Sequence, residues 1–184
     1  MRRAAICALF SIVLPNCAFA VPAAAQDDSA TSGNASASVV RPIGAVPQAE
    51  LAFGAIVVGA SADGTVAVYP ADGVPGFTGS VRPACGGGSA CGAHPARFSV
   101  SGEPGQSYRI MLPLGLQASG RRTGHLLDVF DLQARSVGNP ASDNGGQLDM
   151  AGEDSFAVGG RLSVGAGSPA DIYSADLPVT VSYD

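Results

Sequence analysis

The sequence predicts an all-β fold, an antiparallel sandwich or barrel, for this chain of 184 residues. Turn-forming residues are dense, with 25 Gly and 13 Pro. Between the turns, short runs place Val, Ile, Leu, Phe or Tyr at alternate positions, which is the period of a β-strand. No window combines an apolar stripe at helical spacing with good helix formers and caps. Several short strands separated by turns are typical of sandwiches and barrels.

Residues 1–25 predict a secretion signal peptide. Arg2 and Arg3 precede the apolar run AAICALFSIVLP, and small residues follow it. We expect cleavage between Ala25 and Gln26, although Ala18-Phe19-Ala20 offers a second site. The apolar run is shorter than the roughly 20 residues of a membrane-spanning helix. The mature chain is therefore expected to be exported without inserting into a membrane.

The mature chain is predicted to form one domain. Residues 26–37 are rich in Asp, Ser, Thr, Gly and Asn and predict a flexible leader, and residues 38–184 predict a single β-sandwich, immunoglobulin-like in class. All ten basic residues are Arg, two of which lie in the signal, so eight Arg face 15 acidic residues and the net charge is −7. Nucleic acids and anionic membrane surfaces require a concentrated positive face. We therefore expect neither as a partner.

The strands follow one another with clear turn signals. Asp63-Gly64, Asp72-Gly73 and Asn144-Gly145 mark turns. Alternation predicts strands within 50–59, 65–70, 96–102, 106–113, 125–132, 153–165 and 173–183.

The stretch from Arg97 to Pro113 predicts a β-hairpin. Each half alternates apolar and polar residues, so each strand offers one apolar face to a core. Between the halves, Pro104 presets the backbone for the second turn position and Gly105 tolerates the positive φ of the third, which predicts a type II turn.

Two cysteines of the mature chain, Cys85 and Cys91, predict a disulfide. They flank the loop CGGGSAC, and an oxidising compartment favours their pairing. Closing so short a loop stabilises the fold by roughly 2 kcal/mol in the chain-entropy treatment. A metal site is the competing interpretation, but it needs further ligands and His94 is the nearby histidine.

Four blocks of the sequence resemble an exported bacterial family catalogued as domain of unknown function 4402. In chain order they are ELAFGAIVVGASADGTVAV, ARFSVSGEPGQSYRIMLP, FAVGGRLSVGAG and DIYSADLPVTVSYD. The resemblance covers Val39 to Asp184, and the family has no established activity to carry over. Its pattern is similar to spore-coat-U-type and chaperone-usher pilin domains, which implies an immunoglobulin-like sandwich. The insert from Arg82 to His94, with its cysteine pair, departs from many relatives and has no assigned role.

The pilin similarity draws attention to both chain ends. In such fibres an N-terminal extension completes a neighbouring subunit as an added strand. Val39 and Ile43 lie on one alternate face of SASVVRPIGAV, either as a donor strand or, as we favour because neither face is purely apolar, as the first strand of this subunit's own sheet. The terminal strand alternates cleanly, with Leu177, Val179, Val181 and Tyr183 on one face. Its penultimate tyrosine resembles the pilin pattern that chaperones recognise, and it equally suits the closing strand of a self-contained sandwich.

Catalytic and metal-binding patterns are missing from the sequence. The mature chain has two histidines, His94 and His125, and neither a Gly-x-Ser-x-Gly elbow nor a His-Glu-x-x-His motif. In a regular strand His125 and Asp131 share one face while Asp128 points to the other. The oxygens of Asp143-Asn144-Gly145 and Asp149 fit no calcium loop and are better interpreted as a turn. We therefore expect no enzyme, no metal site and no cofactor.

The sequence leaves two functional expectations. The first is a non-enzymatic exported structural protein, pilin-like or part of the cell surface or envelope, located in the periplasm, at the cell surface or outside the cell. Its partners would be itself or other pilin-like subunits and a periplasmic chaperone. The second is a self-contained secreted module that binds a polysaccharide or a surface partner through loops such as 83–94 or 117–124.

Overall fold

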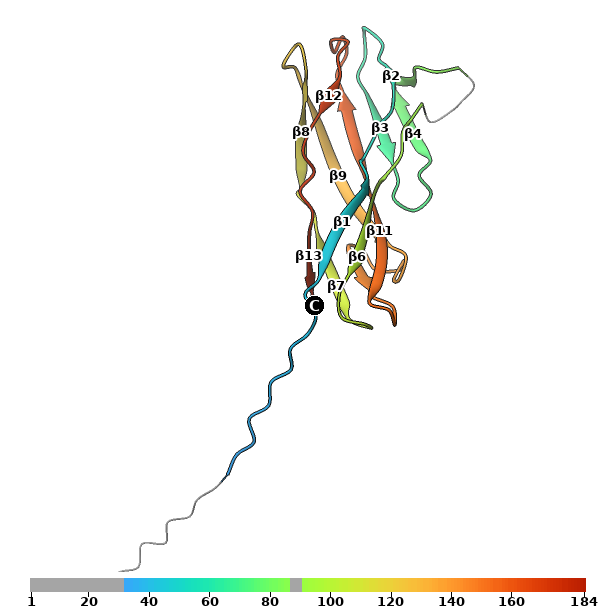
Figure 1. Ribbon diagram of the computed structural model, residues 1–184. Coiled ribbons are helices and arrows are strands. Elements are labelled where there is room, and N and C mark those ends of the chain that lie inside the picture. Colours follow the sequence, from blue (N-terminus) through green and yellow to red (C-terminus); the bar gives the residue numbers. More distant parts are fainter. Residues whose placement is uncertain (1–31, 87–90) are drawn as a thin grey trace, which may run out of the picture. The chain divides into compact units, whose positions relative to one another are not determined.

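The computed structural model describes residues 32–86 and 91–184 (Figure 1). The predicted signal peptide, with its cleavage site at Ala25 and Gln26, lies outside the described residues. Contacts group Val39–Asp184 as one compact unit. In the other unit, Ser32–Ser38 is exposed and forms no strand.

The described residues form 13 strands and no helix, and all the strand pairs among them are antiparallel. The strands are β1 (Gly44–Ala49), β2 (Ile56–Val57), β3 (Gly64–Val68), β4 (Pro75–Gly79), β5 (Arg82–Pro83), β6 (Ala96–Ser101), β7 (Ser107–Met111), β8 (Gly115–Gly120), β9 (Leu126–Ser136), β10 (Gly145–Gln147), β11 (Glu153–Val164), β12 (Tyr173–Ser174) and β13 (Thr180–Tyr183).

The large sheet is built around β11. Its strand order is β1-β6-β11-β9-β8-β12, with β3 also paired to β11 and β4 paired to β3. The first half of β11 pairs with β6, where Phe156 is opposite Phe98, and the second half pairs with β3, where Leu162 is opposite Val66. β9 runs along the other edge of β11. A strand of 12 residues is long enough to pair with two shorter strands, one after the other, along the same edge.

A second sheet of three strands, β10-β7-β13, packs against the first. Tyr108 and Ile110 of β7 belong to the same buried core as Phe156 and Val158 of β11. Because one core is shared by the inner faces of two sheets, the domain is a β-sandwich. The predicted all-β antiparallel fold is confirmed.

The predicted hairpin between Arg97 and Pro113 is wrong. β6 pairs with β1 and β11 in the large sheet, whereas β7 pairs with β10 and β13 in the small one. The turn itself is confirmed, since Gln106 N donates to Glu103 O (3.3 Å) and Gly105 has φ 73°. Alternation shows which face of a strand is apolar, but it does not show which strand lies beside it. The turn therefore carries the chain from one sheet to the other.

Several strand boundaries also differ from the prediction. The run 50–59 provides only β2 and an isolated bridge between Ala52 and His94, and the run 173–183 divides into β12 and β13. β4, with the sequence PGFTG, and β8, with GLQASG, were not predicted. Glycine and small polar residues give such segments little intrinsic strand signal, and pairing with β3 and β9 holds them in the sheet.

Tyr108 anchors the interior of the small sheet. The residue is 0% exposed, and its Oη donates to Asp154 Oδ2 (2.9 Å). Gly146 is opposite Tyr108 on β10, and a Cβ at that position would overlap the tyrosine ring. The close approach of the ring to the backbone therefore requires glycine there.

Candidate functional site

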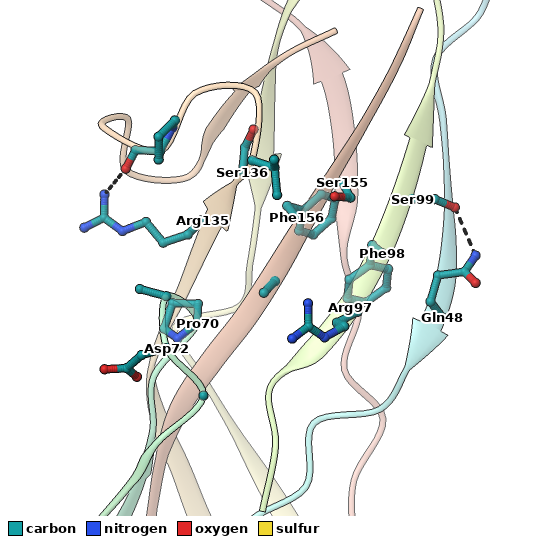
Figure 2. A pocket seen from close by; sticks show the side chains of 15 residues that line it. Gln48, Pro70, Asp72, Arg97, Phe98, Ser99, Arg135, Ser136, Ser155 and Phe156 are labelled. Carbon is teal, nitrogen blue, oxygen red and sulfur yellow. Dashed lines mark hydrogen bonds between the residues drawn. The ribbon is translucent and has the colours of Figure 1, made fainter. Parts of the chain in front are cut away.

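A hollow of about 760 Å³ lies on the outer face of the large sheet (Figure 2). Its floor consists of two cross-strand rows on β6, β11 and the end of β9. In one row Ala157 is opposite Arg97 on one side and Arg135 on the other. In the next row Ser155 is opposite Ser99. We call this feature the Arg97 hollow.

The strand period explains the floor of the Arg97 hollow. Phe98 and Phe156 point to the core, where their rings stack with centroids 4.9 Å apart. Their sequence neighbours must then point outward, because successive side chains of a strand alternate between its faces. The outward residues of β11 are small here, Ser155 and Ala157, so space stays open above the sheet.

Two loops and one edge strand form the walls. The turn Pro70–Gly73, between β3 and β4, stands on one side, and the segment containing Val137 and Pro140, after β9, stands on another. Gln48 of β1 completes the rim, where its Nε2 donates to Ser99 Oγ (3.0 Å). These parts come from distant stretches of the chain, and only the folded sheet brings them together.

Of the three charged side chains that line the Arg97 hollow, Arg135 and Asp72 have hydrogen-bond or ion-pair partners and Arg97 has none among the described residues. Arg135 pairs with Asp143 (Nη2 to Oδ1, 2.8 Å) and donates to the carbonyl oxygen of Pro140. The lining acid Asp72 accepts from Val74 N (3.1 Å). Arg97 forms neither an ion pair nor a side-chain hydrogen bond with any residue in 32–86 or 91–184. In Figure 2 its side chain extends from β6 toward the turn that carries Pro70 and Asp72.

The C-terminal strand β13 is a second feature with functional potential. It pairs with β7 on one edge only, in a register that places Val181 opposite Ile110. Asp184 N donates to Ser107 O (3.3 Å). Because the N–H groups of an antiparallel strand point alternately to its two sides, those of Val181 and Tyr183 point away from β7. Among the described residues, β13 has no ladder partner on that side and no loop residue accepts a hydrogen bond from these two groups, although β1 lies close to β13.

The predicted terminal-strand residues line the inner side of this edge. Leu177, Val179, Val181 and Tyr183 are all half-buried and pack against the core. Tyr183 Oη also donates to Arg41 O (2.7 Å) and accepts from Glu103 N (2.6 Å). The apolar face of the C-terminal segment is thus covered only in part.

The two predicted residues near the start of the domain lie apart. Ile43 directly precedes β1, which pairs with β6 of the same chain, and its side chain packs against the core. Val39 lies outside β1, and the residue is 97% exposed. Pro42 and Pro47 flank or interrupt this first strand, as is usual for an edge strand.

The disulfide between Cys85 and Cys91 is confirmed, with Cα atoms 5.7 Å apart. It lies in the insert from Arg82 to His94, of which residues 87–90 lie outside the described part. Backbone hydrogen bonds from Ala84 N to Ala55 O and from Ala55 N to Cys91 O tie the loop to the chain before β3. His94 is held in a backbone bridge with Ala52, and no group of three potential metal-binding side chains occurs among the described residues.

The histidine and carboxylates considered for catalysis are not brought together. His125 Nδ1 lies 3.4 Å from Tyr173 Oη, Asp128 accepts from Gln117, and Asp131 pairs with Arg161. The regular parity expected across this strand is wrong, because β9 contains a bulge where Asp131 adopts φ 53°. The bulge leaves both Phe130 and Asp131 exposed.

The structure agrees with the interpretation of Asp143-Asn144-Gly145 and Asp149 as turn residues. Asn144 Oδ1 accepts from Ala134 N (2.8 Å), and Asp149 Oδ1 accepts from Ala151 N and Glu153 N. The hydrogen bonds from Glu153 and Ala151 lower the pKa of Asp149. These side chains therefore stabilise turns locally.

Asp171 organises the loop 117–124 and was not singled out from the sequence. Its carboxylate accepts from Arg122 N, Thr123 N and Thr123 Oγ1 at 2.8–2.9 Å. Desolvation alone would raise the pKa of Asp171, but these hydrogen bonds outweigh it and the net effect lowers the pKa well below its usual range. The loop is therefore fixed from a segment some 50 residues later in the chain.

The Arg97 hollow was also missed by sequence reasoning. The sequence did indicate that Arg97 and Ser99 lie on the outward face of one strand, which is one part of the hollow. That signal could not identify Ser155, Ala157 or the Pro70–Gly73 turn as neighbours, because they are joined to it only by sheet pairing.

Comparison with known proteins identifies one family. A family model described as "Domain of unknown function (DUF4402)" matches residues 43–183, a range that includes all 13 strands. No curated protein and no solved structure matches the chain. None of the described residues forms a helix that is long and apolar enough to cross a membrane.

Proposed function

The chain belongs to the DUF4402 family, and we propose that it is a non-enzymatic, exported structural protein of the bacterial cell surface or envelope that associates with copies of itself. The observation that supports this proposal is the open edge of β13. Val179 and Val181 are half-buried there, and the outward N–H groups of Val181 and Tyr183 are free of partners among the described residues. An added strand would cover the apolar side chains and pair these backbone groups.

The other edge of the sandwich near the chain start is less suited to strand addition. β1 contains Pro47, and Pro42 lies two residues before the strand. Proline has no N–H to offer to a neighbouring strand, and natural edge strands use it to block pairing. β13 contains neither proline nor a charged residue between Thr180 and Tyr183. Pro178 lies two residues before β13 just as Pro42 does before β1, so Pro47 within β1 is the difference between the two edges. Of these two edges, β13 therefore offers the better surface for a second copy.

The polar segment ahead of the domain is a poor donor strand. Ser32–Ser38 contains no large apolar residue, and Ile43 packs in the core of its own subunit. Val39 and Val40 are exposed, but they are adjacent and so point to opposite faces of an extended strand. A donor strand gains stability by placing apolar side chains in the neighbour's core. We therefore favour association of β13 with an edge strand of a second copy over insertion of the leader.

The test is the mass of residues 26–184 by size-exclusion chromatography with light scattering, over a range of concentrations. We expect a mass that rises with concentration toward a dimer or larger assembly. Val181→Pro removes an N–H that points to the open edge and not to β7, so the variant is expected to stay folded but monomeric. Val40→Pro, in an exposed position before β1, is the matched control and should assemble like the parent protein.

Circular dichroism and thermal unfolding of both variants verify that they are folded. A parent protein that stays monomeric at every concentration argues against self-association. Assembly that persists unchanged in folded Val181→Pro would exclude the β13 edge as the contact.

A further inference from the structure

We propose that the Arg97 hollow is a binding site for an acidic saccharide, with the guanidinium of Arg97 holding a sugar carboxylate and the neighbouring polar side chains holding sugar hydroxyls. This function is separate from any association through β13, because the hollow lies on the outer face of the large sheet whereas β13 belongs to the small one. The inference rests on three properties of the site, namely its space, its charge and its neutral polar groups.

The space suits a small ligand. The hollow encloses about 760 Å³, and small-molecule sites in proteins commonly measure roughly 300–1,000 Å³. The small side chains of Ser155 and Ala157 line the hollow together with the Pro70–Gly73 turn and Pro140. A concave surface of this kind can contact several faces of one or two sugar rings.

The charge favours one carboxylate. Arg97 forms no ion pair with a described residue, and its planar guanidinium can donate two parallel hydrogen bonds to a carboxylate. Asp72 also lines the hollow, so its two arginines exceed its lining carboxylates by one charge. Arg135 lies opposite Ala157 on the other side from Arg97. Arg135 pairs with Asp143, whose side chain is 83% exposed. Exposed ion pairs of this kind are weak. The second arginine can therefore add attraction for the same anion without leaving a buried charge unpaired.

The neutral groups suit sugar hydroxyls. Ser99 and Ser155 are direct cross-strand neighbours, and side chains in such positions have Cβ atoms roughly 5 Å apart. The Ser155 hydroxyl has no partner in the described residues, and Gln48 is already oriented by its hydrogen bond to Ser99. Hydroxyl and amide groups can both donate and accept, as hydroxyl-rich ligands require.

The rest of the chain disfavours a polyanion. Its formal net charge is −5, and −7 after removal of residues 1–25. A nucleic acid or a highly charged polymer would need many cations and would be repelled by this surplus of carboxylates. One or two arginines beside serines and an amide instead match a ligand with sparse carboxylates and many hydroxyls.

The experiment is isothermal titration calorimetry of residues 26–184 at low ionic strength with trigalacturonate and with sialyllactose. Each is compared with its methyl ester, which has nearly the same shape but no charge. We expect saturable binding of at least one acidic saccharide and affinity at least roughly tenfold lower for its ester, about 1.4 kcal/mol. Added salt should weaken binding.

Three variants locate the site. Arg97→Gln is expected to lower the affinity at least roughly tenfold, and Arg97→Lys to lower it less because the charge remains without the guanidinium fork. Arg121→Gln is the matched control, because Arg121 is an exposed arginine in the 120–125 loop that also lacks an ion-pair partner among the described residues. Its binding should stay within roughly twofold of the parent. Thermal unfolding verifies that all three are folded.

The proposal is overturned if neither acidic saccharide binds, or if the methyl esters bind as well as the acids. It is also overturned if Arg97→Gln and Arg121→Gln have equal effects. Tighter binding of a short neutral-capped peptide with one aspartate than of either saccharide would show that the hollow recognises a protein carboxylate instead.

Discussion

Tyr183 Oη donates to the carbonyl oxygen of Arg41 (2.7 Å), and this hydrogen bond joins the last strand, β13, to the segment that leads into the first strand, β1. The same hydroxyl accepts from Glu103 N (2.6 Å), at the turn where the chain crosses between the sheets. Three segments far apart in sequence therefore meet at one side chain. This arrangement closes one end of the sandwich.

Tyr183→Phe should lower stability while keeping the fold. The substitution removes both hydrogen bonds but retains the ring, so we expect a loss of about 1–2 kcal/mol in the free energy of unfolding. Urea unfolding followed by circular dichroism measures it. Tyr69→Phe is the control, because no described residue hydrogen-bonds to the Tyr69 hydroxyl. Equal stabilities of the two variants would show that the Tyr183 hydroxyl does not fasten the chain ends.

Gly146→Ala should be strongly destabilising. The new Cβ would overlap the ring of Tyr108, which is fully buried and cannot move aside freely. Overpacking of this kind costs roughly 1–3 kcal/mol. Gly44→Ala in β1 is the matched control, because no atom lies within 4 Å of a Cβ built there. Both are compared by thermal unfolding, and the prediction fails if the two variants melt alike.

Tyr108 should make the protein sensitive to high pH. Burial and then its hydrogen bond to Asp154 raise the pKa of Tyr108 well above its usual value. A raised pKa means that the stability contribution is complete below the unfolded-state pKa of about 10 and is lost as the pH rises above it. Absorbance at the tyrosinate band should therefore show one tyrosine that ionises only as the protein unfolds. A Tyr108→Phe variant should lack that step.

Asp171 should make the protein sensitive to low pH. Desolvation opposes ionisation of this carboxyl, but hydrogen bonds from the Arg122–Thr123 segment outweigh it and lower the pKa of Asp171 in the folded state. A lowered pKa gives stability that is present above the unfolded-state pKa of about 4 and is lost as the pH falls below it. Melting temperatures measured from pH 7 to pH 2 should fall less steeply for Asp171→Asn, from a lower starting value. Asp176→Asn, at an exposed position with no hydrogen bond of its side chain among the described residues, should follow the parent curve.

Removal of the disulfide should weaken the domain without unfolding it. The bridge closes a short loop that backbone hydrogen bonds of Ala55 also hold, and its loss should cost roughly 2 kcal/mol. Urea unfolding with and without a reductant measures the difference. A Cys85→Ser, Cys91→Ser double variant should match the reduced protein and be insensitive to reductant. No shift on reduction would mean that the bridge adds no stability.

Local patterns were sufficient for the elements that depend on neighbouring residues. The alternation in 153–165 predicted most of β11, and Pro104-Gly105 predicted the turn that the structure contains. The loop CGGGSAC predicted the disulfide. Strand period, turn geometry and short loop closure are properties of a few consecutive residues, so the sequence expresses them directly.

Long-range packing determines which strands pair, and therefore every feature that is built from paired strands. Alternation could not show that β6 and β7 belong to different sheets, or that a bulge at Asp131 breaks the parity of β9. The Arg97 hollow likewise exists because β11 places Ser155 and Ala157 beside β6, under a turn that begins at Pro70. The amino-acid pattern was enough to establish that this chain forms antiparallel strands with one apolar face. The partners and the open edges of those strands emerged only in the folded domain, since many pairings bury similar apolar faces and only the complete core selects among them.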